Sequence, residues 1–257
     1  MKKKILIILV FLLCLTGCKS SKPLHPTEEE HEKLLKEALK YMSDKYNIDA
    51  NDITVTYNYL YIPGSSYMGS YNSNMAKIEF NGKKCEIHYD SIYGNGYLDD
   101  CQYDEIVHDY RYYFLKKYQF LSYANTDPAT TSRIYYDGDI KSYVKKIIEE
   151  DIRLSGNKYS NRFSISLKGK VDNEVKAKEL YNSEEFKLFL DDLHSFDANF
   201  DVYLLDEIKP NNKHDQGVSN FYEISKRYGY IYIYDKVDNK NTKCTYKNFI
   251  DGICKNK

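Results

Sequence analysis

The sequence predicts an α+β fold in which helices pack on small antiparallel sheets, divided into two subdomains. Short runs of alternating apolar and polar residues are typical of strands with one buried face, and several such runs occur along the chain. Other stretches repeat apolar residues every three or four positions, which is typical of amphipathic helices. A turn-rich stretch at residues 122–138 separates two halves that each contain both patterns, and no sequence repeat relates them.

The first 17 residues have the pattern of an export leader. Lysines at positions 2–4 precede an unbroken apolar run at 5–13. A helix rises about 1.5 Å per residue, so this run cannot cross a hydrocarbon core of about 30 Å. It therefore predicts a cleaved signal peptide rather than a membrane span. Thr16 and Gly17 then supply the small side chains that suit a peptidase site.

Leu15-Thr16-Gly17-Cys18 resembles the lipobox of bacterial lipoproteins, in which an aliphatic residue and two small residues precede a cysteine. The resemblance covers residues 1–18. It implies cleavage between Gly17 and Cys18 and a diacylglyceryl thioether on Cys18, which would tether the chain to the outer face of the bacterial cytoplasmic membrane. Two acyl chains anchor a protein firmly, whereas one does so only marginally. An ordinary secretory signal with an incidental cysteine is the alternative.

After the leader we expect a polar tether at residues 18–26 and a first domain at 27–121. Thr27 followed by Glu30 is a capping box, and apolar residues at helical spacing extend the predicted helix to about Tyr46. Alternation across residues 53–61 predicts a strand. The chain thus enters the first domain through a helix and then a strand.

The clearest local signal in the first domain is a β-hairpin at residues 76–89. Asn81-Gly82 between two alternating runs predicts a two-residue type I′ turn, in a register that places Ile78 opposite Cys85. An apolar stripe across residues 103–121 follows two acidic residues at 99 and 100, which favour a helix N-terminus. The first domain is therefore expected to hold a helix, three strands and a second helix.

Residues 122–138 are the predicted linker, and the second domain is predicted at 139–257. Its helices are expected at residues 140–152 and in a segment that Ser183 caps. Its strands are expected at 163–167, 200–205, 218–224 and 228–234, with the turn between the last two at "SKR". A terminal loop between Cys244 and Cys254 is expected to close the chain.

Four cysteines remain after the leader and the lipid site are set aside, and an even number in an exported chain predicts disulfides. The pairs closest in sequence are Cys85 with Cys101 and Cys244 with Cys254. A zinc site built from the same four cysteines is the alternative. That alternative lacks the CxxC knuckles of structural zinc sites.

Composition argues against a nucleic-acid partner and leaves a ligand of a tyrosine-rich face open. Removing the leader also removes its three lysines, so the formal net charge falls from −1 to −4. A nucleic-acid-binding protein needs a basic footprint, so no nucleic-acid partner is expected, and no cofactor is predicted. The chain has 28 tyrosines and no tryptophan. A tyrosine-rich binding face would explain this, but so would AT-rich codon usage.

No complete catalytic motif is present. The helical pair Asp104 and His108 lies at i,i+4 spacing, as metal ligands or an acid–base pair would, and a solvated helix face is the alternative. An HExxH motif starting at His31 is broken by Leu35. The S-x-x-K motif starting at Ser142 lacks the K-T/S-G strand that would complete a penicillin-binding site.

The predicted function is binding or adaptation at the cell surface, toward a protein or the cell wall, with the membrane reached through the lipid anchor. A cell-envelope hydrolase with scattered catalytic groups is the alternative. The predicted binding surface joins the loops at 63–74 and 91–99, because loops carry binding residues more often than core elements do. Its tyrosines are Tyr67, Tyr71, Tyr93 and Tyr97. Local packing as lids on the first domain is the other explanation for them.

Overall fold

The computed structural model describes residues 27–62, 74–90, 96–128, 132–155, 163–196, 198–208, 220–227 and 230–251, together with residue 254. The chain divides into two compact units, Met1–Tyr97 and Leu98–Lys257, here called the first and the second unit. Each unit combines helical and sheet structure. The predicted α+β fold with two subdomains is confirmed.

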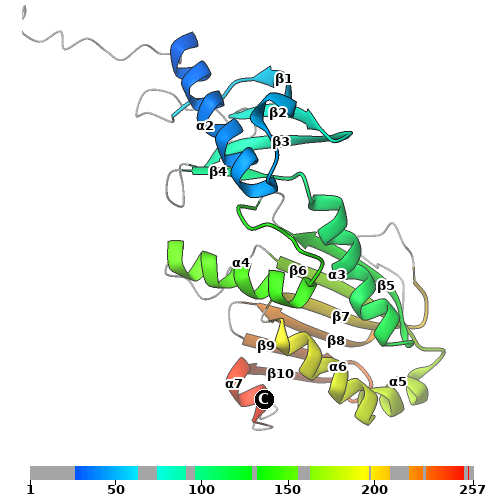
Figure 1. Ribbon diagram of the computed structural model, residues 1–257. Coiled ribbons are helices and arrows are strands. Elements are labelled where there is room, and N and C mark those ends of the chain that lie inside the picture. Colours follow the sequence, from blue (N-terminus) through cyan, green and yellow to red (C-terminus); the bar gives the residue numbers. More distant parts are fainter. Residues whose placement is uncertain are drawn as a thin grey trace, which may run out of the picture. The chain divides into compact units, whose positions relative to one another are not determined.

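The first unit places one helix on a four-stranded sheet of order β1-β2-β3-β4 (Figure 1). Its elements are α2 (Glu28–Tyr46), the short 3-10 helix η1 (Ala50–Asp52), β1 (Thr54–Asn58), β2 (Met75–Phe80), β3 (Lys83–Asp90) and β4 (Gly96–Asp99), the last of which runs across the boundary between the units. The predicted helix is confirmed, because Thr27 Oγ1 accepts a hydrogen bond from the Glu30 backbone N–H at 3.2 Å. The apolar stripe Leu34, Ala38 and Met42 is buried.

The hairpin of β2 and β3 also confirms its prediction. Ile78 pairs with Cys85 in an antiparallel register. Asn81 and Gly82 both have positive φ angles, 49° and 75°, as a type I′ turn requires at its two central positions. Glycine adopts the second of these angles without steric cost, so two residues suffice to reverse the chain.

Two predicted features of the first unit need correction. The strand predicted at 53–61 is present but spans only Thr54–Asn58, and a register shift between Val55 and Tyr57 interrupts its alternation. Such a bulge re-aims the side chains that follow it, and the Tyr57 side chain is 45% exposed. In addition, Asp99 ends the strand β4 and does not start a helix.

The second unit contains a six-stranded mixed sheet of order β10-β9-β8-β7-β6-β5. Its strands are β5 (Leu121–Pro128), β6 (Phe163–Lys170), β7 (Asn199–Leu205), β8 (Asn220–Arg227), β9 (Tyr230–Asp235) and β10 (Lys240–Thr245). Its helices are α3 (Tyr103–Lys117), α4 (Ile140–Ser155), α5 (Glu174–Tyr181), α6 (Glu184–Ser195) and α7 (Tyr246–Ile250). Strands β6 and β7 are parallel, and α5 and α6 provide the crossover that parallel neighbours need.

The boundary predicted at residues 122–138 is wrong. The strand β5 lies inside that stretch, and α3 belongs to the second unit, with its buried residues in the core of that unit. Threonine, asparagine and aspartate make the sequence of β5 look like a linker. Pairing along β6 over the length of the strand overrides that composition.

Helices α3 to α6 lie over one face of the six-stranded sheet (Figure 1). The core between these layers is aromatic and closely packed. Its buried side chains include Tyr110, Phe114, Phe186, Phe189 and Tyr222, each at most 1% exposed. Many tyrosines therefore serve as core residues, with their rings edge-on or tilted to their neighbours.

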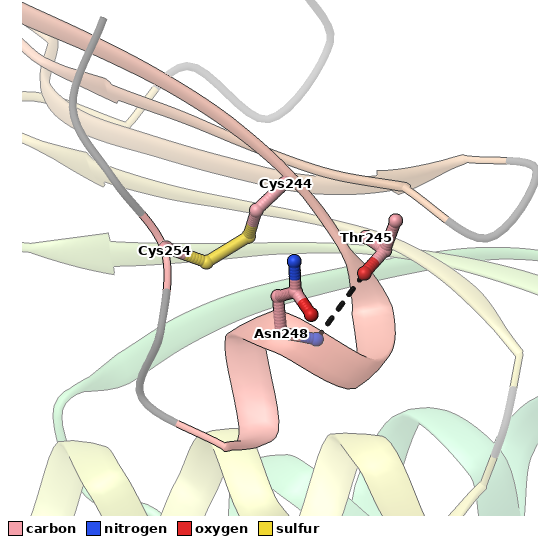
Figure 2. Close-up of a disulfide and its surroundings, with 4 residues drawn as sticks. All are labelled: Cys244, Thr245, Asn248 and Cys254. Atoms are coloured by element: carbon pink, nitrogen blue, oxygen red, sulfur yellow. Dashed lines mark hydrogen bonds between the residues drawn. A yellow bond between two sulfur atoms is a disulfide. The ribbon is translucent and has the colours of Figure 1, made fainter.

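The C-terminal segment is more regular than the predicted loop, because it contains β10 and α7. Figure 2 shows the disulfide between Cys244 and Cys254, with a Cα–Cα distance of 5.5 Å, and the cap that Thr245 Oγ1 provides to the Asn248 N–H at 3.2 Å. The pairing of Cys244 with Cys254 is thus confirmed. The turn predicted at "SKR" is wrong, because residues 225–227 lie within β8.

Cys85 and Cys101 are disulfide-bonded cysteines as well, in agreement with the prediction of disulfides. The sulfur of a disulfide is not the thiolate that binds zinc. The alternative of a four-cysteine zinc site therefore does not hold.

Candidate functional site

A cleft of about 610 Å³ lies beside the start of α3 in the second unit. It contains both residues of the predicted metal pair. The lining residues are Gln102, Asp104, Glu105, His108, Asp109, Tyr135, Tyr136, Asp137 and Gly138. One wall is therefore the first turns of α3, and the other is the segment that precedes α4.

The buried side chain of Gln102 joins the two walls of the cleft. Its Nε2 donates to the Tyr136 carbonyl at 2.8 Å, and its Oε1 accepts from the Tyr136 N–H at 2.9 Å. A side-chain amide that satisfies both backbone groups of one residue acts like a strand partner. The relative position of the two walls is therefore fixed by hydrogen bonds.

Three polar side chains form a hydrogen-bonded chain across the cleft. Nδ1 of His108 lies 2.9 Å from Oδ1 of Asp109, and the Tyr136 hydroxyl donates to Oδ2 of Asp109 at 2.5 Å. The His108 ring also packs against Tyr112, with the centroids 4.3 Å apart. Asp109 is the central acceptor of this chain.

Electrostatics keep the central acceptor ionised. The hydrogen bond from Tyr136, and then the one from His108, lower the pKa of Asp109. Burial, with a contribution from Asp109, raises the pKa of Tyr136. A carboxyl that acts as a general acid needs a raised pKa, so Asp109 is suited to accepting hydrogen bonds rather than to giving up a proton.

Within the described residues, no third ligand joins the predicted metal pair. His108 contacts Asp109 rather than Asp104, and its Nδ1 is already engaged there. In the part of the chain that the structure describes, Asp104 and His108 belong to no group of three potential ligand atoms within 4.8 Å of one another. Both side chains are exposed, which agrees with the alternative of a solvated helix face.

A second candidate site lies on the opposite face of the six-stranded sheet, away from the helices of the core. The strand β9 reads Tyr-Ile-Tyr-Ile-Tyr, and side chains alternate between the faces of a sheet. Ile231 is fully buried, whereas Tyr230 and Tyr232 are 42% and 38% exposed and Tyr234 is half-buried. We call Tyr230, Tyr232 and Tyr234 the tyrosine ladder.

Polar residues of the neighbouring strands flank the tyrosine ladder. The residues directly opposite it are Arg227, Ser225 and Glu223 in β8 and Thr245, Lys243 and Asn241 in β10. Nζ of Lys243 lies 4.6 Å from the ring centroid of Tyr230 and 5.1 Å from that of Tyr232. This cation therefore sits beside two exposed rings at cation–π distance.

The other charges on this face are engaged with the protein. Arg227 donates a hydrogen bond to Asp201 in β7. Burial raises the pKa of Asp201, although the charge of Arg227 opposes that effect. Burial, and then the charge of Asp201, raise the pKa of Glu223. Lys243 is exposed, and no carboxylate in the described part of the chain forms an ion pair with it.

The tyrosine surface predicted on the loops is corrected at one position. Tyr97 lies in β4, is only 8% exposed, and donates to the Leu34 carbonyl at 3.0 Å and to Glu37 at 3.2 Å. It packs against α2, which agrees with the alternative of local packing. Tyr67, Tyr71 and Tyr93 lie outside the described residues.

Sequence reasoning recognised β9 as a strand but did not use its alternation. Isoleucine at every second position indicates which face is buried, and so places the three tyrosines on the other face. The signal was present in five consecutive residues. What was missing was the position of β9 in a sheet covered by helices on one side.

The leader and the lipidation site, Gly17 and Cys18, also lie outside the described residues. None of the helices in the described part of the chain combines the length and the apolar composition that a membrane span needs. The chain matches no protein-family model, and no curated protein or solved structure matches it.

Proposed function

We propose that the protein is a lipid-anchored binding protein on the outer face of the bacterial cytoplasmic membrane and that the tyrosine ladder contacts its ligand. The observation that carries this proposal is the exposure of Tyr230 and Tyr232 on the sheet face opposite the helical layer. Tyrosine offers a large, rigid contact area at a low cost in conformational entropy.

A binding function explains the alignment of the exposed tyrosines better than codon usage does. Single exposed aromatic residues are ordinary on protein surfaces. Here three tyrosines share one face of one strand, with Lys243 placed between two of the rings. Codon usage accounts for the number of tyrosines but not for their alignment.

The lipobox supports the location. A diacylglyceryl group on Cys18 would hold the mature N-terminus at the membrane, and the tether at 18–26 would separate the folded units from it. A protein held in this way can present a sheet face to the cell wall or to a neighbouring envelope protein.

Co-sedimentation with cell envelopes isolated from the source bacterium tests the proposal. We expect Tyr230→Ser combined with Tyr232→Ser to lose binding when all variants also carry Cys18→Ala, so that no lipid anchor holds the protein on the membrane. Tyr57→Ser combined with Tyr112→Ser is the matched control, because these two tyrosines are each 45% exposed elsewhere on the surface. Equal melting temperatures would show that neither pair is needed for folding. Retained binding by the ladder variant, or equal loss by the control, would contradict the proposal.

A second candidate function is hydrolysis of an envelope component in the cleft beside α3. The hydrogen-bonded chain of His108, Asp109 and Tyr136 favours it, because such chains orient a histidine for proton transfer. Release of soluble fragments from isolated cell walls by the wild type, and none by His108→Ala, would establish this activity.

A further inference from the structure

We propose that the ligand of the tyrosine ladder is a polysaccharide chain whose sugar rings carry carboxylate groups. This inference rests on the proposed binding function and names the chemistry of its ligand. It follows from the spacing of the rings, the size of the exposed face, the side chains around it and the position of one cation.

The ladder suits a linear ligand with flat apolar faces. Alternate residues of a strand are about 6.7 Å apart, so the Cα atoms of Tyr230 and Tyr234 span about 13 Å along β9. Sugar rings present C–H groups on their faces, and these groups stack on aromatic rings. A chain of sugars laid along β9 would meet one tyrosine after another.

The area around the ladder suits a ligand of a few sugar rings. Three strands are about 14 Å wide and five residues are about 17 Å long, which gives roughly 240 Å² for the part of the sheet face formed by β8, β9 and β10. A stable protein interface covers about 800 Å² on each partner, so a protein partner would have to contact the sheet well beyond these three strands.

The side chains around the rings also favour a sugar. The cores of protein interfaces are depleted in charged residues, whereas the ladder is flanked by a hydroxyl, an amide or a charge at each position. Ser225, Asn241 and Thr245 lie opposite ladder residues in the two neighbouring strands. They can exchange hydrogen bonds with sugar hydroxyls while the rings stack.

Lys243 supplies the charge complementarity. Its Nζ is within 5.1 Å of the centroids of both Tyr230 and Tyr232, so an anion that reaches it must be attached to a ring stacked on those tyrosines or to its immediate neighbour. A carboxylated sugar has its charge on the stacking ring itself. A phosphodiester-linked polyol has no ring to stack.

Single-stranded nucleic acid also combines stacking rings with negative charge, but it requires a groove with cations along the backbone. On this face Arg227 is bonded to Asp201, and Glu223 adds a carboxyl group. One exposed lysine cannot contact the successive phosphates of a nucleic-acid backbone. The local charge therefore fits isolated carboxylates better than a polyanion.

The chemical class of the ligand is tested on isolated cell envelopes treated in parallel with protease, with nuclease, and with protease followed by periodate, which cleaves the vicinal diols of sugars. We expect the full-length protein with Cys18→Ala, which lacks the lipid anchor, to bind after protease and after nuclease and to lose binding after periodate. Loss after protease or nuclease alone would overturn the inference while leaving the binding function intact. Failure to bind untreated envelopes would overturn the proposed function itself.

The charge is tested in two further arms. Capping of envelope carboxylates with a carbodiimide and a neutral amine should abolish binding, whereas mild acid extraction of phosphodiester-linked polymers should not. Lys243→Met should weaken binding about tenfold, the loss expected for one charged contact. Lys240→Met is the control, since Lys240 lies in the same strand and pairs with Asp238 at 3.3 Å. Binding that survives carboxylate capping, or equal binding by Lys243→Met and wild type, would overturn the anionic assignment.

Discussion

Nζ of Lys141 lies 2.6 Å from Oδ1 of Asp192, and Asp192 is a buried carboxylate at the centre of a polar cluster. Its other oxygen accepts from Nζ of Lys117 at 3.0 Å. The hydroxyls of Tyr113 and Tyr118 donate to the same carboxylate at 3.0 and 3.2 Å. One acidic side chain of α6 therefore holds the ends of α3 and α4 in place.

Asp192→Asn should destabilise the second unit by about 2 kcal/mol, because it removes the charge that two lysines and two hydroxyls share. Burial alone would raise the pKa of Asp192, but the hydrogen bonds from Lys141 and Lys117 outweigh it and lower the pKa. A lowered pKa contributes stability above the unfolded value, about 3.9. That contribution is lost as the pH falls through the folded value.

Chemical denaturation of the wild type and Asp192→Asn between pH 7 and pH 3 measures both effects. The difference between the two proteins should shrink as the pH falls below about 4. Asp191→Asn is the matched control, since Asp191 is the exposed neighbour in the same helix. A difference that stays constant with pH would show that the charge of Asp192 is not the source of the stabilisation.

Tyr136→Phe should raise the pKa of Asp109 toward its ordinary value. The hydrogen bond from Tyr136 is the largest cause of the lowered pKa of Asp109, and the phenylalanine ring keeps the packing while removing the donor. A carboxyl NMR titration would follow the change directly. Loss of this partly buried hydrogen bond should also cost about 1 kcal/mol of stability.

Tyr112→Phe provides the control for that experiment. Tyr112 packs against the ring of His108, but its hydroxyl does not donate to Asp109. The pKa of Asp109 should therefore be the same in this variant as in the wild type. An unchanged pKa in Tyr136→Phe would show that the short contact across the cleft is not maintained in solution.

Local signals in the sequence were sufficient for the elements that local interactions determine. The Asn81-Gly82 turn and the pairing of Ile78 with Cys85 follow from alternation and from the φ angles that glycine allows. The caps at Thr27 and Ser183 follow from side-chain acceptors at helix N-termini, and both accept the hydrogen bond expected of them.

The assignment of elements to sheets could not be predicted from the same signals. The apolar stripe of α3 shows that the helix is amphipathic but not which sheet it covers, and α3 was placed with the wrong unit. Tyr97 and Tyr230 each follow a glycine, yet the first is buried and the second is 42% exposed. The two cases differ in whether helices cover the face of the sheet on which the tyrosine lies.

Each of the two candidate sites combines residues that are close in sequence with residues that only the tertiary structure brings together. Residues 104–109 follow one another in α3 and were visible as an acidic cluster, but Tyr136 joins them through tertiary structure. The tyrosine ladder needs only one strand, although its flanking residues Arg227 and Lys243 come from two others. Contacts between elements far apart in sequence leave no local pattern.

Replacing Cys244 and Cys254 by alanine should destabilise the second unit by about 2.7 kcal/mol in the chain-entropy model for a separation of ten residues. Equilibrium denaturation of the oxidised wild type and of the double variant measures this difference. Thr245→Ala is the comparison for the same segment, because loss of its cap on Asn248 should cost about 1 kcal/mol. A double variant as stable as the wild type would show that α7 is held by packing alone.

Cys18→Ala should abolish the membrane association that the lipobox implies. A thioether can form only on the cysteine sulfur, and the two acyl chains contribute about 0.8 kcal/mol for each buried methylene group. The wild type should therefore enter the detergent phase on phase separation and sediment with membranes, whereas the variant should not carry lipid. Mass spectrometry of the mature N-terminal peptide identifies the modification.

Cys14→Ala is the matched control for the anchor. Cys14 lies four residues before Cys18, within the segment that the resemblance assigns to the cleaved leader, so its loss should leave lipidation and membrane association unchanged. A wild-type protein with an unmodified N-terminal peptide, free in the medium, would support the alternative of an ordinary secretory signal. The tyrosine ladder would then act in a secreted protein, and envelope binding would depend on the ladder alone.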